Sequence, residues 1–186
     1  MKKVLLLVSL VLFISSCSNE FVFTKDNVES TYKAENRSLN LEGKNIKNFV
    51  NLNSYMSGTE VNNIFVWNNE IQLIDVSWFE KLWKLDINNN DIRFIWDLKL
   101  PEKVRHLNLS NNNLDSLKWL EKYTNLKTID LSYNNLEDED LIFDSYPRLK
   151  FINIEWNNVS DKMLETIDSF NARYLLNNED PYADDK

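Results

Sequence analysis

The sequence repeats one spacing of aliphatic residues and asparagine, and this repeat constrains the fold more than any other feature. The pattern is Leu-x-x-Leu-x-Leu-x-x-Asn-x-Leu, in which isoleucine or valine can replace leucine. Its five copies begin at Val61, Leu82, Val104, Leu126 and Leu149, so successive copies start 21, 22, 22 and 23 residues apart. A nearly constant period of this length predicts similar units stacked along one axis, each contacting only its neighbours.

Each copy combines two periodicities. In the stretch His-Leu-Asn-Leu-Ser at 106–110, the two leucines face one side and the polar residues face the other, which is the period of a β-strand. Beyond the asparagine, aliphatic residues recur at every third position, as at Leu114, Leu117 and Leu120, which suits 3₁₀ turns or a loose helical return. One coil cannot enclose its apolar side alone, but coils stacked about 4.8 Å apart through parallel strands can do so.

The asparagine of each copy falls where the chain leaves the strand. Backbone groups in this turn lie beyond the strand hydrogen bonds, and each would cost roughly 1 to 3 kcal/mol if it were buried unpaired. A side-chain amide both donates and accepts, so it can bridge successive turns, which a carboxylate cannot do. We therefore predict a structural ladder of Asn69, Asn90, Asn112, Asn134 and Asn157. The extra amides Asn89, Asn111 and Asn135 are expected to form turns or to lie on the surface.

This spacing resembles that of the leucine-rich-repeat family, and the second half of each copy resembles the internalin-like subclass with 22-residue repeats. The resemblance covers residues 61–159 strictly and residues 36–180 with degenerate ends. It implies an α/β solenoid of about six repeats plus a C-terminal cap. The expected form is a short, curved, right-handed coil with a parallel sheet on its concave face and 3₁₀ turns, loops or short helices on its convex face.

Both ends of the repeat region depart from the pattern. The first, weaker copy has Lys44 where the asparagine should be. After the last copy, Ser160 is a candidate N-cap of a helix, and Tyr174 and Leu176 are candidates for a last edge strand. We expect both ends to act as caps that hide the terminal core from water.

In such a solenoid, the strand residues that do not face the core line the concave sheet. The centre of this surface is polar and mildly acidic, whereas aromatic residues lie toward both ends. Exposed aromatic residues around polar groups are typical of protein interfaces. We therefore predict that a protein or peptide partner binds Phe65, Trp67, Asp86, Asn108, Asp130, Tyr133, Phe151, Asn153 and Trp156.

Two alternatives to this interpretation remain open. Some of these aromatic side chains could cover the flanks or pack against the caps instead of binding a partner. Four other tryptophans are expected to pack on the convex side or at edges, namely Trp78, Trp83, Trp96 and Trp119. Aromatic platforms also suit sugars, so a glycan ligand is a second interpretation.

Charge and motifs argue against other functions. The formal net charge is −8 and the pI is near 4.8, so the protein surface would repel the negatively charged backbone of a nucleic acid. His106, the single histidine, belongs to no catalytic motif and is expected on the surface. Asp86 and Asp130 lie two coils apart and could bind a cation only weakly. We predict no enzymatic activity, no metal and no cofactor.

The first residues form a separate segment. Lys2 and Lys3 are positively charged, residues 4–14 are apolar, and two serines precede Cys17, the only cysteine. This order predicts a secretion signal at 1–16, and Ile-Ser-Ser-Cys at 14–17 resembles the lipobox of bacterial lipoproteins. The resemblance implies cleavage before Cys17 and acyl chains that anchor the protein to a membrane. An ordinary signal peptide with an incidental cysteine and an uncleaved anchor are the alternatives.

These features together predict an exported lipoprotein on the bacterial cell surface or facing the periplasm. Residues 17–35 would form a tether and the start of an N-terminal cap, 36–180 the repeat domain, and 181–186 an acidic tail. The mature chain would be a monomer with a formal net charge of −10, because the signal contains two lysines and no acid. We expect the domain to be a non-catalytic interaction module; the alternative is a structural subunit of an envelope complex that binds through its edge.

Overall fold

The computed structural model describes residues 21, 23–50, 52, 60–94, 98–118, 120–140 and 146–175. Several predictions concern other parts of the chain. The signal peptide at 1–16, Cys17, Trp96, Trp119, Leu176 and the tail at 181–186 lie outside the described residues.

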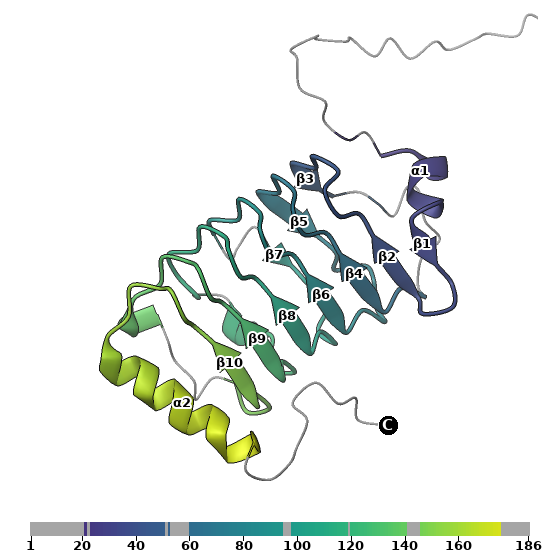
Figure 1. The fold of residues 1–186 in the computed structure, drawn as a ribbon. Coiled ribbons are helices and arrows are strands. Elements are labelled where there is room, and N and C mark those ends of the chain that lie inside the picture. The colour runs from purple at the N-terminus through teal and green to yellow at the C-terminus, as the bar shows by residue number, and fades with distance from the viewer. Residues whose placement is uncertain are drawn as a thin grey trace, which may run out of the picture.

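The main sheet has seven strands in the order β1-β2-β4-β6-β8-β9-β10. They are β1 (Tyr32–Lys33), β2 (Ser38–Asn40), β4 (Asn63–Phe65), β6 (Lys84–Asp86), β8 (His106–Asn108), β9 (Thr128–Asp130) and β10 (Phe151–Asn153). All neighbours pair in parallel except β1, which is antiparallel to β2. Figure 1 shows these strands in one row, with helix α1 (Lys25–Glu29) at one end and helix α2 (Asp161–Leu175) at the other. The predicted concave parallel sheet of a solenoid is therefore confirmed.

The sequence repeat sets the register of this sheet. Equivalent central residues pair from strand to strand, namely Leu39, Ile64, Leu85, Leu107, Ile129 and Ile152. The aliphatic residues of all five copies are buried, apart from Val159, which is partly buried. One continuous core therefore runs through the stack, and the remaining strand side chains are left for the concave surface.

The convex side differs between the two halves of the molecule. The early coils carry a second parallel sheet of β3 (Asn48–Phe49), β5 (Leu73–Asp75) and β7 (Leu98–Lys99), which the sequence analysis did not predict. Later coils return through the expected 3₁₀ turns, η3 (Leu120–Lys122) and η4 (Asp138–Asp140). The difference follows from periodicity, because buried Ile74 and Val76 alternate with more exposed residues, as strand residues do.

The N-terminal cap begins before the first strand. Thr24 and Asn27 form a reciprocal capping box at the start of α1. Phe23 packs edge-on against Phe21 and against Phe49, with ring centroids 5.3 and 5.6 Å apart. These contacts cover the first coil, so Phe21 and Phe23 belong to the cap.

The C-terminal cap is helix α2. Ser160 acts as its N-cap, since its hydroxyl accepts a hydrogen bond from the N–H of Met163 at 3.2 Å, and Ile167 is buried against the last coil. The predicted edge strand at Tyr174 is wrong, because Tyr174 belongs to α2. The apolar residues of this segment continue at helical spacing through Phe170, which packs against the core.

Asn171 on α2 takes the place of a neighbouring strand. Its Oδ1 accepts a hydrogen bond from the N–H of Ile152 at 3.0 Å, and its Nδ2 donates to the carbonyl of Ile152 at 2.7 Å. The outer edge of β10 is therefore paired at its centre, which protects it from pairing with another chain.

Candidate partner-binding site

The turns that follow the carboxyl ends of the main strands, called the exit turns below, are held by the buried asparagine ladder. Asn112 is typical: its Oδ1 accepts from the N–H of Ile92 in the preceding coil, and its Nδ2 donates to the carbonyls of Ile87, Leu109 and Ser110 at 3.1 to 3.2 Å. Equivalent bonds are made by Asn69, Asn90, Asn134 and Asn157. Each amide joins its own coil to the one before it, so the concave surface is rigidly positioned.

The polar centre of the predicted site also supports the exit turns. The Oδ1 atoms of Asp86, Asn108, Asp130 and Asn153 accept hydrogen bonds from the backbone N–H two residues ahead at 3.0 to 3.3 Å. The hydroxyls of Ser110 and Ser132 donate to the same oxygens at 2.7 Å. These four residues are half-buried, and they fix the turn as well as line the surface.

One aromatic group lies toward the N-terminal end of the concave surface. Phe65 and Trp67 meet edge-on with ring centroids 5.3 Å apart, and the Nζ of Lys84 lies 5.8 Å from the centroid of Phe65. Both rings are half-buried. The structure therefore brings the first two predicted aromatic residues together beside a cation from the next coil.

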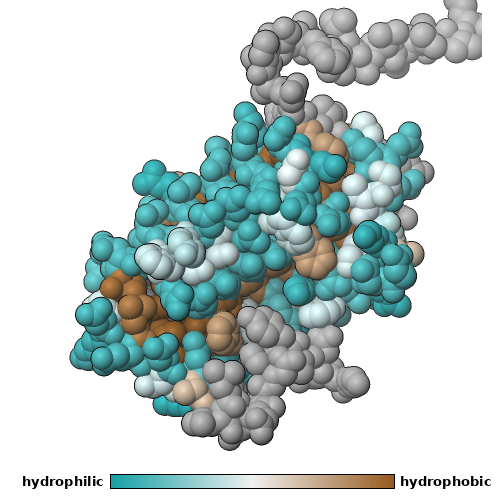
Figure 2. Space-filling model, in the orientation of Figure 1, coloured by the Kyte–Doolittle hydropathy of each residue, from teal (hydrophilic) through white to brown (hydrophobic). Residues whose placement is uncertain are grey.

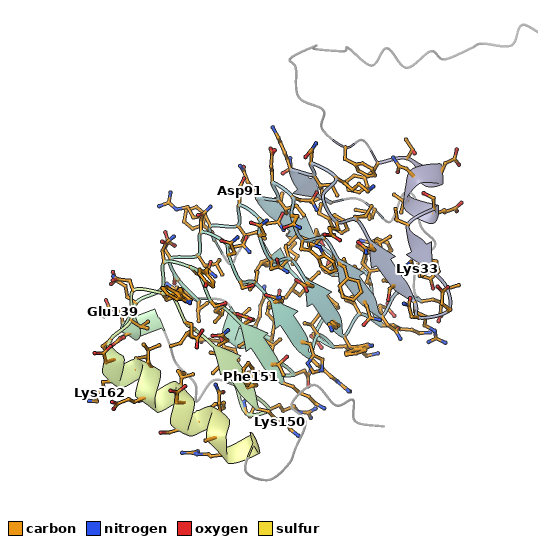
Figure 3. All side chains as sticks on the ribbon, in the orientation of Figure 1. Lys33, Asp91, Glu139, Lys150, Phe151 and Lys162 are labelled. Atoms are coloured by element: carbon orange, nitrogen blue, oxygen red, sulfur yellow. The ribbon has the colours of Figure 1, made fainter. Side chains whose placement is uncertain are left out.

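A second aromatic group lies toward the C-terminal end. Tyr133 and Trp156 are stacked, with ring centroids 5.5 Å apart and an angle of 13° between the rings. Their exposed fractions are 53% and 69%, and they are the exposed large hydrophobic residues of the described chain. Phe151 lines a hollow of about 410 Å³ between β10 and α2. Figure 3 labels Phe151 on β10 near α2, and Figure 2 shows hydrophobic surface gathered between these two elements.

Tyr133 and Trp156 share an unusual backbone conformation. They continue a column in the exit turns in which every residue has a left-handed φ of 51° to 60°, formed by Gly43, Asn68, Asn89, Asn111, Tyr133 and Trp156. Glycine and asparagine adopt this conformation readily, whereas bulky side chains rarely do.

The exposed asparagines of this column form a second ladder that the sequence analysis missed. The Nδ2 of Asn89 donates to the Oδ1 of Asn68, and the Nδ2 of Asn111 donates to the Oδ1 of Asn89 at 2.6 Å. The signal was present in the sequence, since three copies have asparagine directly before the buried one.

The predicted surface position of His106 is wrong. Its side chain is 3% exposed, its Nδ1 lies 2.9 Å from the Oγ1 of Thr128, and its ring meets Trp83 edge-on at 5.3 Å. Trp83 stands just before β6, at the edge of the concave sheet, and this neighbouring ring explains the burial. Beside His106 and Thr128 lies a hollow of about 120 Å³ that Lys84, Asp86 and Asp130 also line.

A hollow outside the predicted site lies beside the exit turns. Its volume is about 780 Å³, and it is lined by Gln72, Asp91, Arg93, Phe94, Asn113, Asp115 and Asn135. Arg93 there pairs with Asp115 at 3.3 Å. Among the residues that the structure describes, no group of three or more histidine, cysteine or acidic side chains could hold a metal ion. What the concave surface offers is a rigid polar centre between two aromatic groups.

Comparison with known proteins agrees with this architecture. A family model for leucine-rich repeats, in two copies, matches residues 102–142. A comparison with curated proteins gives no match. Many solved structures are similar to the chain.

The complex of SNF and U2A′ from Drosophila melanogaster contains a similar chain, with 19% identity, a TM-score of 0.57, and coverage of 83% of this chain and 98% of that one. The leucine-rich-repeat domain of APL1B shows 24% identity and a TM-score of 0.54, over 67% of this chain and 39% of that one. An internalin, inlF, from Listeria monocytogenes shows 26% identity and a TM-score of 0.49, over 55% of this chain and 31% of that one. The chain thus spans less than two-fifths of the length of the last two. The chain has the leucine-rich-repeat fold, and its residues 102–142 match the model of that family.

Proposed function

We propose that the protein is an exported, lipid-anchored lipoprotein whose leucine-rich-repeat domain binds a protein or peptide partner through its concave surface. The observation that supports this most is the placement of two aromatic groups, Phe65 with Trp67 and Tyr133 with Trp156, toward opposite ends of a polar centre. Repeat proteins of this kind generally use the concave side of the solenoid for binding.

The physical basis is preorganisation. The hydrogen-bonded exit turns hold the strand residues in place before a partner arrives, so little conformational entropy is lost on binding. Tryptophan and tyrosine bury large apolar areas with few rotatable bonds, which makes them effective anchors. The half-buried acids and amides between them would supply hydrogen bonds that orient the partner.

The membrane anchor is proposed from the sequence at 1–17. Cys17 would carry the lipid, because it directly follows the apolar segment and two serines. None of the helices in the described ranges combines the length and the apolar character needed to cross a bilayer. Replacing Cys17 with alanine should abolish labelling by a radioactive fatty acid and release the protein from the membrane fraction. Retained labelling in the Cys17→Ala variant would rule out this attachment site.

The partner-binding role can be tested by affinity capture from intact cells and from host extract. We expect Trp67→Ala and Trp156→Ala each to weaken capture of a specific partner about tenfold, because each removes an aromatic anchor. Asn113→Ala, on the exposed flank, is the matched control and should capture as much partner as the wild type. Equal capture by all three variants would refute the placement of the site.

A structural role in an envelope complex would use a sheet edge instead. In the described part of the chain, β1 pairs with one side of β2 and Asn171 pairs with the outer side of β10. Because both ends of the parallel stack are covered, we favour the concave surface. A glycan ligand stays as the second candidate, since the exposed ring pair of Tyr133 and Trp156 suits a sugar face.

A further inference from the structure

We propose that Tyr133, Trp156 and the Glu155 carboxylate bind an arginine side chain of a basic peptide segment. This inference rests on the proposed function, because it names the chemistry of the partner at one end of the concave surface. The guanidinium group would lie on the exposed indole of Trp156 and pair with Glu155.

Exposure is the first reason to assign binding to this place. Trp156 is 69% exposed and Tyr133 is 53% exposed, whereas Phe65 and Trp67 at the other end are half-buried. The parallel rings support each other, with an angle of 13° between them, and thereby fix the orientation of the indole. An indole exposed in this position lowers the solubility of the protein and adds little buried area to the core.

Backbone strain is the second reason. Tyr133 and Trp156 have φ values of 56° and 59°, a left-handed conformation that is strained for a bulky residue. The three preceding coils place Asn68, Asn89 and Asn111 at the same position, where asparagine is tolerated. Folding alone would therefore be better served by asparagine, and the two rings are the residues that a ligand would use.

The position of Trp156 leaves its outer face available. The column of left-handed residues follows the strand order, and β10 is the last parallel strand. Tyr133 stacks on one face of Trp156, and among the described residues no further parallel strand follows β10, which agrees with the 69% exposure of Trp156. A flat group from a partner can therefore extend the column by one step.

The negative charge of the chain and of Glu155 indicates which flat group of a partner would stack on Trp156. The chain has a formal net charge of −8, and Glu155, next to Trp156, is exposed and has no ion pair among the described residues. Elsewhere in the molecule, aromatic rings already hold cations: Arg93 lies 5.0 Å from the centroid of Phe94, and Lys122 lies 4.9 Å from that of Tyr123. Tryptophan is the best ring for such a contact. Arginine fits better than lysine, because its planar group stacks on a ring while it donates two hydrogen bonds to a carboxylate.

The test uses the full-length protein in detergent and follows the indole N–H signal of Trp156 by NMR, assigned with a Trp156→Phe variant. The probes are the peptide acetyl-Gly-Arg-Gly-amide and its citrulline counterpart, which has nearly the same shape and no charge. We expect the arginine peptide to shift the Trp156 signal, with affinity about fivefold higher than that of the citrulline peptide.

Three variants sharpen the test. Trp156→Asn, in which binding is followed by the backbone amide signal of Glu155, should remove the preference for arginine. It should also keep or raise the thermal unfolding midpoint, because asparagine suits the left-handed position. Glu155→Gln should weaken binding of the arginine peptide about threefold or more. Asn113→Ala, on the exposed flank, is the control and should leave the response of Trp156 unchanged.

Equal binding of both peptides, or undiminished arginine preference in Trp156→Asn, would overturn the inference. A shift of Trp156 caused by an N-acetylglucosamine oligomer and not by the arginine peptide would also overturn it, in favour of a glycan. Partner capture distinguishes failure of the arginine site from failure of the proposed function. If partner capture depends on Trp67 and not on Trp156, the concave site stands and the arginine site falls; if capture depends on neither, the proposed function itself falls.

Discussion

Asparagine performs two tasks at adjacent residues of three exit turns, those that contain Asn69, Asn90 and Asn112. The buried member, such as Asn90 or Asn112, is about 6% exposed and joins two coils through donated and accepted hydrogen bonds. The exposed member, Asn89 or Asn111, provides a left-handed backbone angle and a surface ladder. One amide therefore stabilises the stack, and its neighbour allows the chain to turn.

Replacement of a buried ladder residue should be costly. Asn112→Ala leaves the N–H of Ile92 without its partner and removes three donated hydrogen bonds, including one of the two that the carbonyl of Ile87 accepts, so we expect a loss of roughly 3 kcal/mol in the free energy of unfolding. Asn112→Asp should lose a similar amount, because a carboxylate cannot donate to the carbonyls. Urea denaturation measures both effects. The exposed neighbour Asn113 is the control, and Asn113→Ala should change stability by less than about 0.5 kcal/mol.

Asp75 on the convex sheet should contribute to acid sensitivity. Burial alone would raise the pKa of Asp75, but hydrogen bonds from Ser77 at 2.7 and 3.2 Å and the Lys99 ammonium at 3.3 Å outweigh it and lower the pKa below its ordinary value. A carboxyl group with a lowered folded-state pKa stabilises the fold above its unfolded pKa, near about 4, and that stabilisation is lost as the pH falls through the folded-state value.

The corresponding variant is Asp75→Asn. At pH 7 it should be about 1 kcal/mol less stable than the wild type, and the difference should shrink as the pH falls below about 4. Chemical denaturation at several pH values gives both curves. Asp91→Asn, at an exposed position, controls for the change in net charge. A constant difference across the whole pH range would contradict the assignment.

At the scale of elements, the strands of the main sheet follow from the sequence more directly than the return limbs do. The return limbs are the segments that run back along the convex side of each coil. The period places β4, β6, β8, β9 and β10, because the same aliphatic spacing recurs in every coil. The return limbs vary in sequence, so a second sheet in early coils and 3₁₀ turns in later ones could not be separated by the same reasoning.

The candidate site was predictable in part for the same reason. Alternation along a strand identifies which residues face the concave side, but burial of His106 depends on Trp83, which another coil supplies. Likewise, the left-handed backbone at Tyr133 and Trp156 depends on turn geometry, for which the asparagines of preceding coils were the available signal.

Helix α2 protects the last strand through one side chain. Asn171→Ala removes both hydrogen bonds to Ile152 and exposes part of the outer edge of β10, so we expect the variant to self-associate through this edge. Sedimentation velocity should show a monomer for the wild type and a concentration-dependent larger species for the variant. Ser169→Ala, on the exposed side of the same helix, is the control. A variant that stays monomeric at high concentration would show that other parts of the cap protect the edge.

At the scale of the whole molecule, the stack is a short rod of coils with different surfaces along its length. Its two ends are closed by α1 with β1 and by α2, so no terminal coil of the described chain leaves its core open. The repeat also makes the concave side continuous, because every strand contributes residues in register. A partner that spans this side would contact both aromatic groups at once.

The most direct test of this account is photocrosslinking in cells that express the protein. A photoreactive benzoylphenylalanine is introduced at Asn88, on the concave side, or at Asn113, on the flank. We predict a discrete adduct with a protein partner from position 88 and none from position 113, because the partner lies across the exit turns of the sheet. Adducts that form from position 113 and not from position 88 would contradict a concave binding surface.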